Sequence, residues 1–258
     1  MTGVQTCALP IFCPTPKGLP IASTISPTST ASLSVNVSLY KKIAFDPVKD
    51  LQPISWISSV PLVLVVHPSV PAKSAQELVA LTKRQQGGLN GASNGAGTTS
   101  HLSLEMLKQF AGAKLEHIAY KGGGPAIAAM VSGEVDFQFA TALAAQPFIK
   151  QGKVRALAVT TAKRSGAFPD LPTMASIYPG FESDNWYAMF FPAGTPKEIV
   201  ARLNAEILKA LKAPDLRDFI VNEGGDPVGS TPAELAEYFK REIDKYAKVI
   251  KAGNITAD

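Results

Sequence analysis

Residues 90–120 read NGASNGAGTTSHLSLEMLKQFAGAKLEHIAY, and the rest of the chain is organised around this stretch. A turn rich in glycine and hydroxyl residues leads into a segment with apolar residues four apart, which predicts a helix. Thr99 is the predicted N-cap, and Gly112 stands where a residue in the left-handed conformation would end the helix. Glycines let a ligand approach the backbone, and a helix N-terminus offers unpaired N–H groups. The stretch therefore predicts an anion site for carboxylate or phosphate, with a simple capped helix start as the alternative.

This turn differs from the common nucleotide-binding loops. A Walker motif has Lys before its Ser/Thr, and Thr98 stands at that place. The dinucleotide fingerprint needs G-x-G-x-x-G directly after a strand, whereas the glycines here are Gly91, Gly95 and Gly97. The sequence therefore does not favour a nucleotide.

The composition limits the class of protein. The chain has 258 residues, nearly half of them hydrophobic, which suits one large domain or two of ordinary size. The net charge of +4 is spread along the chain without a long Lys/Arg run, so no nucleic-acid partner is expected. No apolar run approaches the roughly 20 residues of a membrane span. Two cysteines and three separated histidines give no metal spacing, so we expect neither metal nor cofactor.

Along the chain, strand patterns alternate with helix patterns. Strands are expected at residues 54–59, 62–67, 115–119, 134–139, 155–160 and 186–191. Capping boxes predict helices that start at Ser74, Thr195 and Thr231, and a second glycine turn at 122–124 precedes another. This alternation predicts an α/β architecture with mostly parallel sheets, in which residues 62–67 and 186–191 form the two crossings of a hinge.

The N-terminal region fits this pattern poorly. Residues 1–13, MTGVQTCALPIFC, lack the basic segment of a secretory signal and resemble a translated sequencing adapter, so we expect a non-native leader and a receptor that is incomplete at its N-terminus. Residues 21–36 are rich in Ser and Thr, which is typical of a polar linker. The alternative is that they form a second, hydroxyl-lined wall of a binding cleft.

Several stretches together resemble one family. They are SLYKKIAFDPVKD from Ser38, PLVLVVHPSVPAKSAQEL from Pro61, GASNGAGTTSHLSLEML from Gly91, AYKGGGPAIAAMVSGEVDFQF from Ala119 and FFPAGTPKEIVARLN from Phe190. In this order they resemble the substrate-binding proteins of tripartite tricarboxylate transporters, the Bug-type or TctC-like extracytoplasmic receptors. The resemblance runs from about residue 38 to residue 255.

The resemblance implies a two-domain, type II periplasmic-binding-protein fold that closes like a Venus flytrap over a small carboxylate. Residues 14–68 and 186–258 are expected to form domain one, which is incomplete because its Pro/Gly ligand loop has no match, although residues 16–18 resemble a remnant of that domain. Residues 69–185 are expected to form domain two. The resemblance further implies a monomeric periplasmic receptor that serves the membrane subunits of such a transporter.

The family's site residues map onto the glycine turns of domain two. The expected ligand-binding residues are Ser93, Asn94, Gly95, Gly97, Thr98, Ser100, His101, Gly122 and Thr141. Many members carry an Asp where this chain has Ala140, which favours a plain carboxylic acid over an amino acid as the ligand.

An enzyme is the alternative function, for instance a transferase that acts on a carboxylated or phosphorylated small molecule. Such an enzyme needs a nucleophile beside a base. Ser100 and His101 are adjacent on the expected helix and point about 100° apart, so they form a poor dyad. A scaffold without a ligand leaves the hydroxyl-lined turns unexplained. The sequence therefore favours a binding protein that performs no catalysis.

Overall fold

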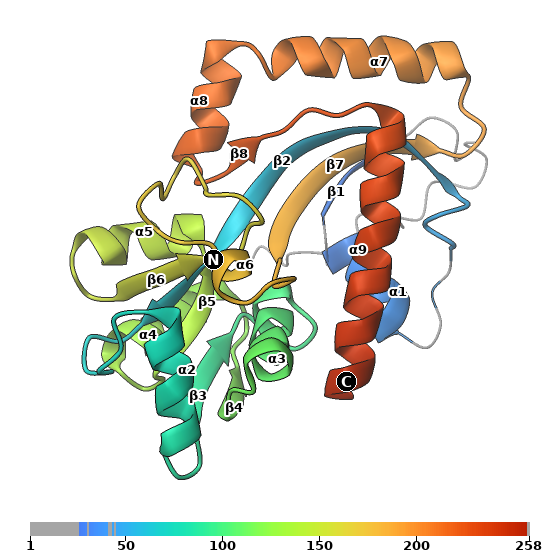
Figure 1. Cartoon of the computed structure of the whole chain (residues 1–258). Helices are drawn as coiled ribbons and strands as arrows, with labels where there is room; N and C mark the ends of the chain where they lie inside the picture. The colour runs from blue at the N-terminus through green and yellow to red at the C-terminus, as the bar shows by residue number, and fades with distance from the viewer. Residues whose placement is uncertain (1–25, 30, 41–42, 44, 257–258) are drawn as a thin grey trace, which may run out of the picture.

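The computed structural model describes residues 26–29, 31–40, 43 and 45–256 (Figure 1). The expected leader, residues 1–13, and residues 16–18 lie outside the described residues. The strands are β1 (Ser26–Ser29), β2 (Leu51–Val66), β3 (Leu89–Ser93), β4 (Leu115–Ala119), β5 (Phe137–Thr141), β6 (Arg155–Val159), β7 (Asp184–Pro192) and β8 (Asp226–Pro227). The helices are α1 (Asn36–Leu39), α2 (Ala75–Arg84), α3 (Thr99–Ala111), α4 (Gly123–Ser132), α5 (Ala142–Lys150), α6 (Met174–Ile177), α7 (Lys197–Ala210), α8 (Pro214–Asn222) and α9 (Pro232–Gly253). None of these helices in the described part combines the length and the apolar content that a membrane crossing needs.

Strand β2 runs through the whole molecule. Its first part pairs with β7 from Leu51 to Pro61, and its last five residues, 62–66, pair with β5. The expectation of two separate strands in this region is therefore wrong. The strand stays continuous because Pro61 pairs with Asp184, the first residue of β7, so its missing N–H falls at the end of that ladder.

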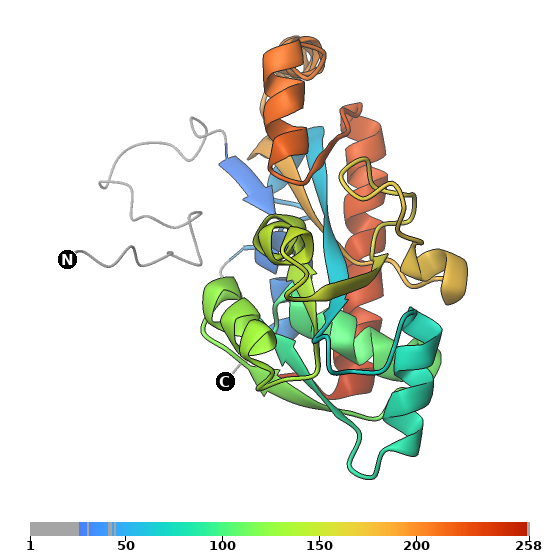
Figure 2. The ribbon, with the colours of Figure 1, turned by 90° about the vertical axis from the view of Figure 1, so that its left-hand side faces the viewer.

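The sheet has two regions that differ in strand direction (Figures 1 and 2). In the first region β3 pairs in parallel with both β4 and β5, while β5 and β6 each run antiparallel to β2. Strands β3 to β6 therefore share one direction, as the sequence predicts. In the second region β1, β7, β2 and β8 pair antiparallel, because β2 and β7 cross the molecule in opposite directions.

The apolar run at the end of β2 is buried on both of its faces. Leu62, Leu64 and Val66 belong to a core packed under α2, α3 and α9, whereas Val63 and Val65 belong to a core under α4 and α5. Successive side chains of a strand point to opposite faces, so an unbroken apolar run requires cover on both sides. A third core packs α9 onto Trp186 and other residues of β7.

Most helix ends agree with the local signals in the sequence. Ser74 caps α2 through its bond from Glu77 N, and Gly112 ends α3 with φ 62°. Thr231 forms a complete capping box with Glu234 at the start of α9. The predicted start of α2, the stop of α3 and the start of α9 are thus confirmed.

Two predicted caps are wrong. The N-cap of α3 is Thr98, whose side chain accepts from His101 N, while Thr99 already lies inside the helix. The predicted box at Thr195 does not form, because Pro196 has an extended backbone and is itself the N-cap of α7. The Thr195 hydroxyl donates to the Pro192 carbonyl instead, at 2.8 Å.

The Ser/Thr-rich region is more ordered than a linker. Residues 26–29 form β1, which adds to the sheet beside β7. A π-helical turn, Ala31–Val35, and α1 follow, and Leu33 and Val35 are completely buried. Apolar residues at these two positions hold the segment against the core, which corrects the linker interpretation for the described part of residues 21–36.

Candidate functional site

Three helices begin at the same edge of the sheet. Strands β3, β4 and β5 lie side by side in the order β5, β3, β4, and each leads into a helix: α3, α4 and α5, respectively. Neither α4 nor α5 has a side chain that caps its first turn. The first N–H groups of a helix have no partner within the helix, so this edge presents hydrogen-bond donors and partial positive charge.

Hydrogen bonds around Asn94 tie the first two turns to each other and to β5. The Asn94 carbonyl accepts from Gly122 N at 3.0 Å, and its side-chain oxygen accepts from Gln138 Nε2 at 3.0 Å. The Ser93 carbonyl accepts from Tyr120 N at 3.0 Å. Loops from β3 and β4 and a side chain of β5 therefore form one connected unit.

The nine residues expected at the site fall into two groups. Asn94, Gly95, Thr98, Gly122 and Thr141 are partly accessible, and they lie in the three turns. The other four, Ser93, Gly97, Ser100 and His101, are buried. The first group therefore lines the surface of the site, and the second lies beneath it.

Two buried side chains are bonded within the protein. The Ser100 hydroxyl donates to the Phe139 carbonyl at 2.7 Å, which joins α3 to β5. The Ser93 hydroxyl lies 2.6 Å from His117 Nε2 and accepts from Gly95 N at 3.2 Å. These contacts shape the glycine turn from below.

Three glycines in the turns, Gly95, Gly97 and Gly122, adopt backbone conformations that other residues rarely adopt. Gly97 has φ 71°, and a Cβ at this position would collide with Leu39 of α1. Gly122 has φ 110° and has open space where a side chain would be. Positions 97 and 122 therefore need glycine, Gly97 for its conformation and its close contact, Gly122 for its conformation.

The His101 ring is part of this support. It is 7% exposed, and its Nδ1 accepts from Gly97 N at 3.1 Å. The ring stacks on His117 with centroids 3.8 Å apart and planes 12° apart. Burial, the His117 ring and the charge of Lys108 together lower the pKa of His101 to about 4. His101 is therefore neutral near pH 7, which suits its role as an acceptor.

His117 and Asn185 were missed by the sequence reasoning. Strand alternation along β4 puts His117 on the same side as the buried Leu115, and this was the available signal. Asn185, from β7, accepts from the Thr99 hydroxyl at 2.6 Å. This hydrogen bond joins the start of α3 to β7, and no local pattern in the sequence indicates it.

Ala140 lies in β5 directly before Thr141. It is 1% exposed and packs in the core under α4 and α5. The inference that Ala140 favours a plain carboxylic acid over an amino acid stays a prediction.

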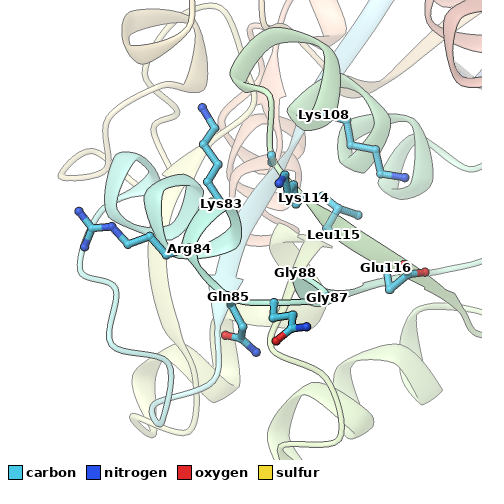
Figure 3. Close-up of a pocket in the computed structure, with 11 residues that line it drawn as sticks. Lys83, Arg84, Gln85, Gly87, Gly88, Lys108, Lys114, Leu115 and Glu116 are labelled. Atoms are coloured by element: carbon cyan, nitrogen blue, oxygen red, sulfur yellow. The ribbon is translucent and has the colours of Figure 1, made fainter.

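A groove of about 690 Å³ lies at the opposite edge of the sheet, lined by Lys83, Arg84, Lys108 and Lys114 among others (Figure 3). Lys83 and Arg84 are in the last turn of α2, and Lys108 is in the last turn of α3. Cations at these ends offset the negative end of the helix dipole. The groove therefore faces helix C-termini, and its basic side chains complement their partial negative charge. No group of three or more metal-ligating side chains occurs among the described residues.

The chain matches known proteins over most of its length. Residues 11–255 match the family model described as the tripartite tricarboxylate transporter family receptor. BugT of Bordetella pertussis is 35% identical over 225 residues, which is 87% of this chain and 69% of that protein. A protein encoded in the tcbD–tcbE intergenic region of Pseudomonas sp. is 33% identical over 89% of this chain and 69% of its own length.

Solved structures agree with this assignment. R. palustris Rpa4515, solved with adipate, has a TM-score of 0.79 and 30% identity, over 93% of this chain and 81% of that one. MatC from Rhodopseudomonas palustris, solved with bound malate, has a TM-score of 0.72 and 29% identity, over 88% of this chain and 78% of that one. With the α/β architecture and the glycine turns described above, these matches show that the chain belongs to the tripartite tricarboxylate transporter receptor family.

Proposed function

We propose that this receptor captures a small mono-, di- or tricarboxylate for a tripartite transporter, as a monomer in the periplasm, and delivers it to the membrane subunits. The observation that carries the proposal is the edge of the sheet at which α3, α4 and α5 all begin, two of them without a side-chain cap. A carboxylate is the right size and charge to accept from such N–H groups. Adipate and malate, seen in two similar structures, are both dicarboxylates, which supports this class.

We assign the residues of the site to two roles. Backbone N–H groups at the starts of α3, α4 and α5, with the polar side chains of Asn94 and Thr141, contact the carboxylate. The Thr98 hydroxyl caps α3 and donates to the Gly95 carbonyl at 2.7 Å. Ser93, Ser100 and His101 hold the first turn from below, since their polar atoms are bonded within the protein. Gly95 and Gly122 keep the turns open to the ligand, and Gly97 lets the first turn pack closely against Leu39.

The contacts of Ser100 and His101 argue against an enzyme. The Ser100 hydroxyl is directed to the Phe139 carbonyl, and the His101 Nδ1 accepts from the Gly97 amide. Neither group is therefore available to activate the other as nucleophile and base. We propose that the protein binds its ligand without chemical change.

Carboxylates should raise the unfolding temperature of the protein. A ligand that binds only the folded state stabilises it by about 2.7 kcal/mol at a concentration of 100 times its Kd. A thermal-shift screen of adipate, malate, citrate and short monocarboxylates should include at least one that raises the midpoint by several degrees. Stabilisation by nucleotides, with every carboxylate silent, would contradict the proposal.

Gly123→Ala should weaken carboxylate binding by about tenfold while the fold stays intact. A Cβ at Gly123 would make an ordinary contact of 3.7 Å with the Asn94 amide, so the added methyl fits the free protein but narrows the space between the two turns. Gly124→Ala is the matched control, because a Cβ there meets nothing within 4 Å. Isothermal titration with the most stabilising ligand of the screen measures the affinities of both variants. Equal affinities for the two variants would place the ligand elsewhere.

A further inference from the structure

Two histidines from different elements lie together beneath the ligand turn. His101 is in α3 and His117 is in β4, and their rings stack with centroids 3.8 Å apart. Each ring has a contact with the turn between β3 and α3. His101 Nδ1 accepts from Gly97 N, and His117 Nε2 lies 2.6 Å from the Ser93 hydroxyl. The pair therefore holds the turn at both of its ends.

The bond from Gly97 determines which nitrogen of His101 carries the proton. Because the Gly97 N–H donates, Nδ1 has no proton, and the neutral ring keeps its hydrogen on Nε2. Nε2 lies 3.9 Å from Glu105 Oε1, on the side away from the turn. Lowering of the pKa of His101 by burial, by His117 and by Lys108 keeps this neutral form at pH 7. The pKa of His117 is also lowered, mainly by burial.

The position of Gly97 depends on this bond. Its φ of 71° is a conformation that leaves the amide N–H directed back toward α3, where His101 accepts it. The Ser93 hydroxyl, in contact with His117, also bonds both the N–H and the carbonyl of Gly95, each at 3.2 Å. The amides of the turn are thus aligned by groups that lie beneath it and are not exposed to a ligand.

We propose that His101 and His117 are positioning residues of the carboxylate site: they hold the turn from Ser93 to Gly97 in its binding geometry without contacting the ligand. This inference rests on the proposed function. A buried histidine pair that only stabilises the fold is the competing explanation. The two explanations predict different effects of a conservative substitution on the affinity for the carboxylate.

The test compares two substitutions at His101. Asn presents a side-chain oxygen close to the place of Nδ1, so His101→Asn keeps an acceptor for Gly97 N. Leu has no acceptor, and the bond is lost. We expect His101→Leu to weaken adipate or malate binding about tenfold or more, and His101→Asn to stay within about threefold of the wild type. His67→Leu is the matched control, since His67 bonds Ser69 and follows β2 at the opposite edge of the sheet.

Backbone amide NMR of the free protein supplies a readout that does not need a ligand. The Gly97 amide should lose its protection from hydrogen exchange in His101→Leu and keep it in His101→Asn and His67→Leu. Imidazole ¹⁵N shifts at pH 7 should show Nδ1 of His101 unprotonated. If the wild type binds neither adipate nor malate, the proposed function fails, whereas these spectra still show whether His101 holds the turn.

Three results would overturn the inference. His101→Leu that binds within about twofold of the wild type would show that the bond does not matter for the site. Equal losses in His101→Asn and His101→Leu, with the Gly97 amide still protected from exchange in the former, would point to direct contact of the ring with the ligand. If His101→Leu does not fold, His101→Gln takes its place in the comparison, because the Gln oxygen reaches toward the place of Nε2 and not of Nδ1. Equal affinities of the Gln and Asn variants for the carboxylate would then contradict the proposal.

Discussion

Gly97→Val is expected to lower the free energy of unfolding by about 2–4 kcal/mol and to abolish carboxylate binding. Valine at φ 71° is strained, and its Cβ collides with the Leu39 side chain that covers the turn. Leu39 is the flexible partner in this collision, so the backbone strain is the larger part of the effect. Once the turn moves, the Gly97 amide no longer meets His101 Nδ1, and the alignment of the site is lost.

Urea unfolding and isothermal titration measure the two effects of Gly97→Val. Gly124→Val is the matched control, because that position has open space and lies in the first turn of α4. Lys121→Ala, at an exposed residue beside the second turn, should cost less than about 1 kcal/mol of binding free energy if Lys121 only adds to the local field. A larger loss for Lys121→Ala than for Gly97→Val would show that a charge, and not the backbone amides, carries recognition.

Glu242→Gln is expected to stabilise the protein at pH 8 by about 2–3 kcal/mol and to change little at pH 5. Glu242 is 1% exposed, and its Oε2 has no hydrogen-bond partner among the described residues. Burial raises its pKa from 4.5 to about 7, with Lys245 opposing the shift and Asp184 adding to it. Above pH 7 the folded protein therefore carries a buried charge that the unfolded chain holds in water.

The sign of this pH dependence follows from proton binding. Between pH 4.5 and about 7 the folded state holds a proton on Glu242 that the unfolded state has already lost, so stability falls as the pH rises through this window. Glutamine is neutral at every pH and keeps an oxygen for Lys245, so the loss disappears in the variant. Glu237→Gln, on an exposed part of α9, should change stability by less than about 0.5 kcal/mol.

Urea unfolding of the three proteins at pH 5 and pH 8 checks this prediction. Destabilisation of Glu242→Gln at pH 8 would mean that the ion pair with Lys245 outweighs the burial of the charge. In that case, Glu242 strengthens the contact of α9 with the crossing strands instead of weakening it.

Local patterns in the sequence were sufficient for much of the fold. The alternation of strands and helices, the stop of α3 at Gly112 and the capping box at Thr231 were all predicted. Each of these depends on residues within one or two turns of the chain, where backbone conformation and hydrogen bonds are set by immediate neighbours. The glycine turns were also found in this way, because positive φ angles and exposed helix starts have their own residue types.

The tertiary structure alone decided the rest. The continuity of β2 depends on β7 and β5, and the antiparallel pairings around it depend on the direction in which distant segments cross. The stack of His101 on His117 joins two elements, and the burial of Glu242 depends on strands far from it in the chain. Alternation along β4 indicates that His117 faces the same side as Leu115, but such a pattern does not say which distant residue a buried polar side chain meets. The role of a buried polar side chain in this protein therefore depends on which distant segment covers it.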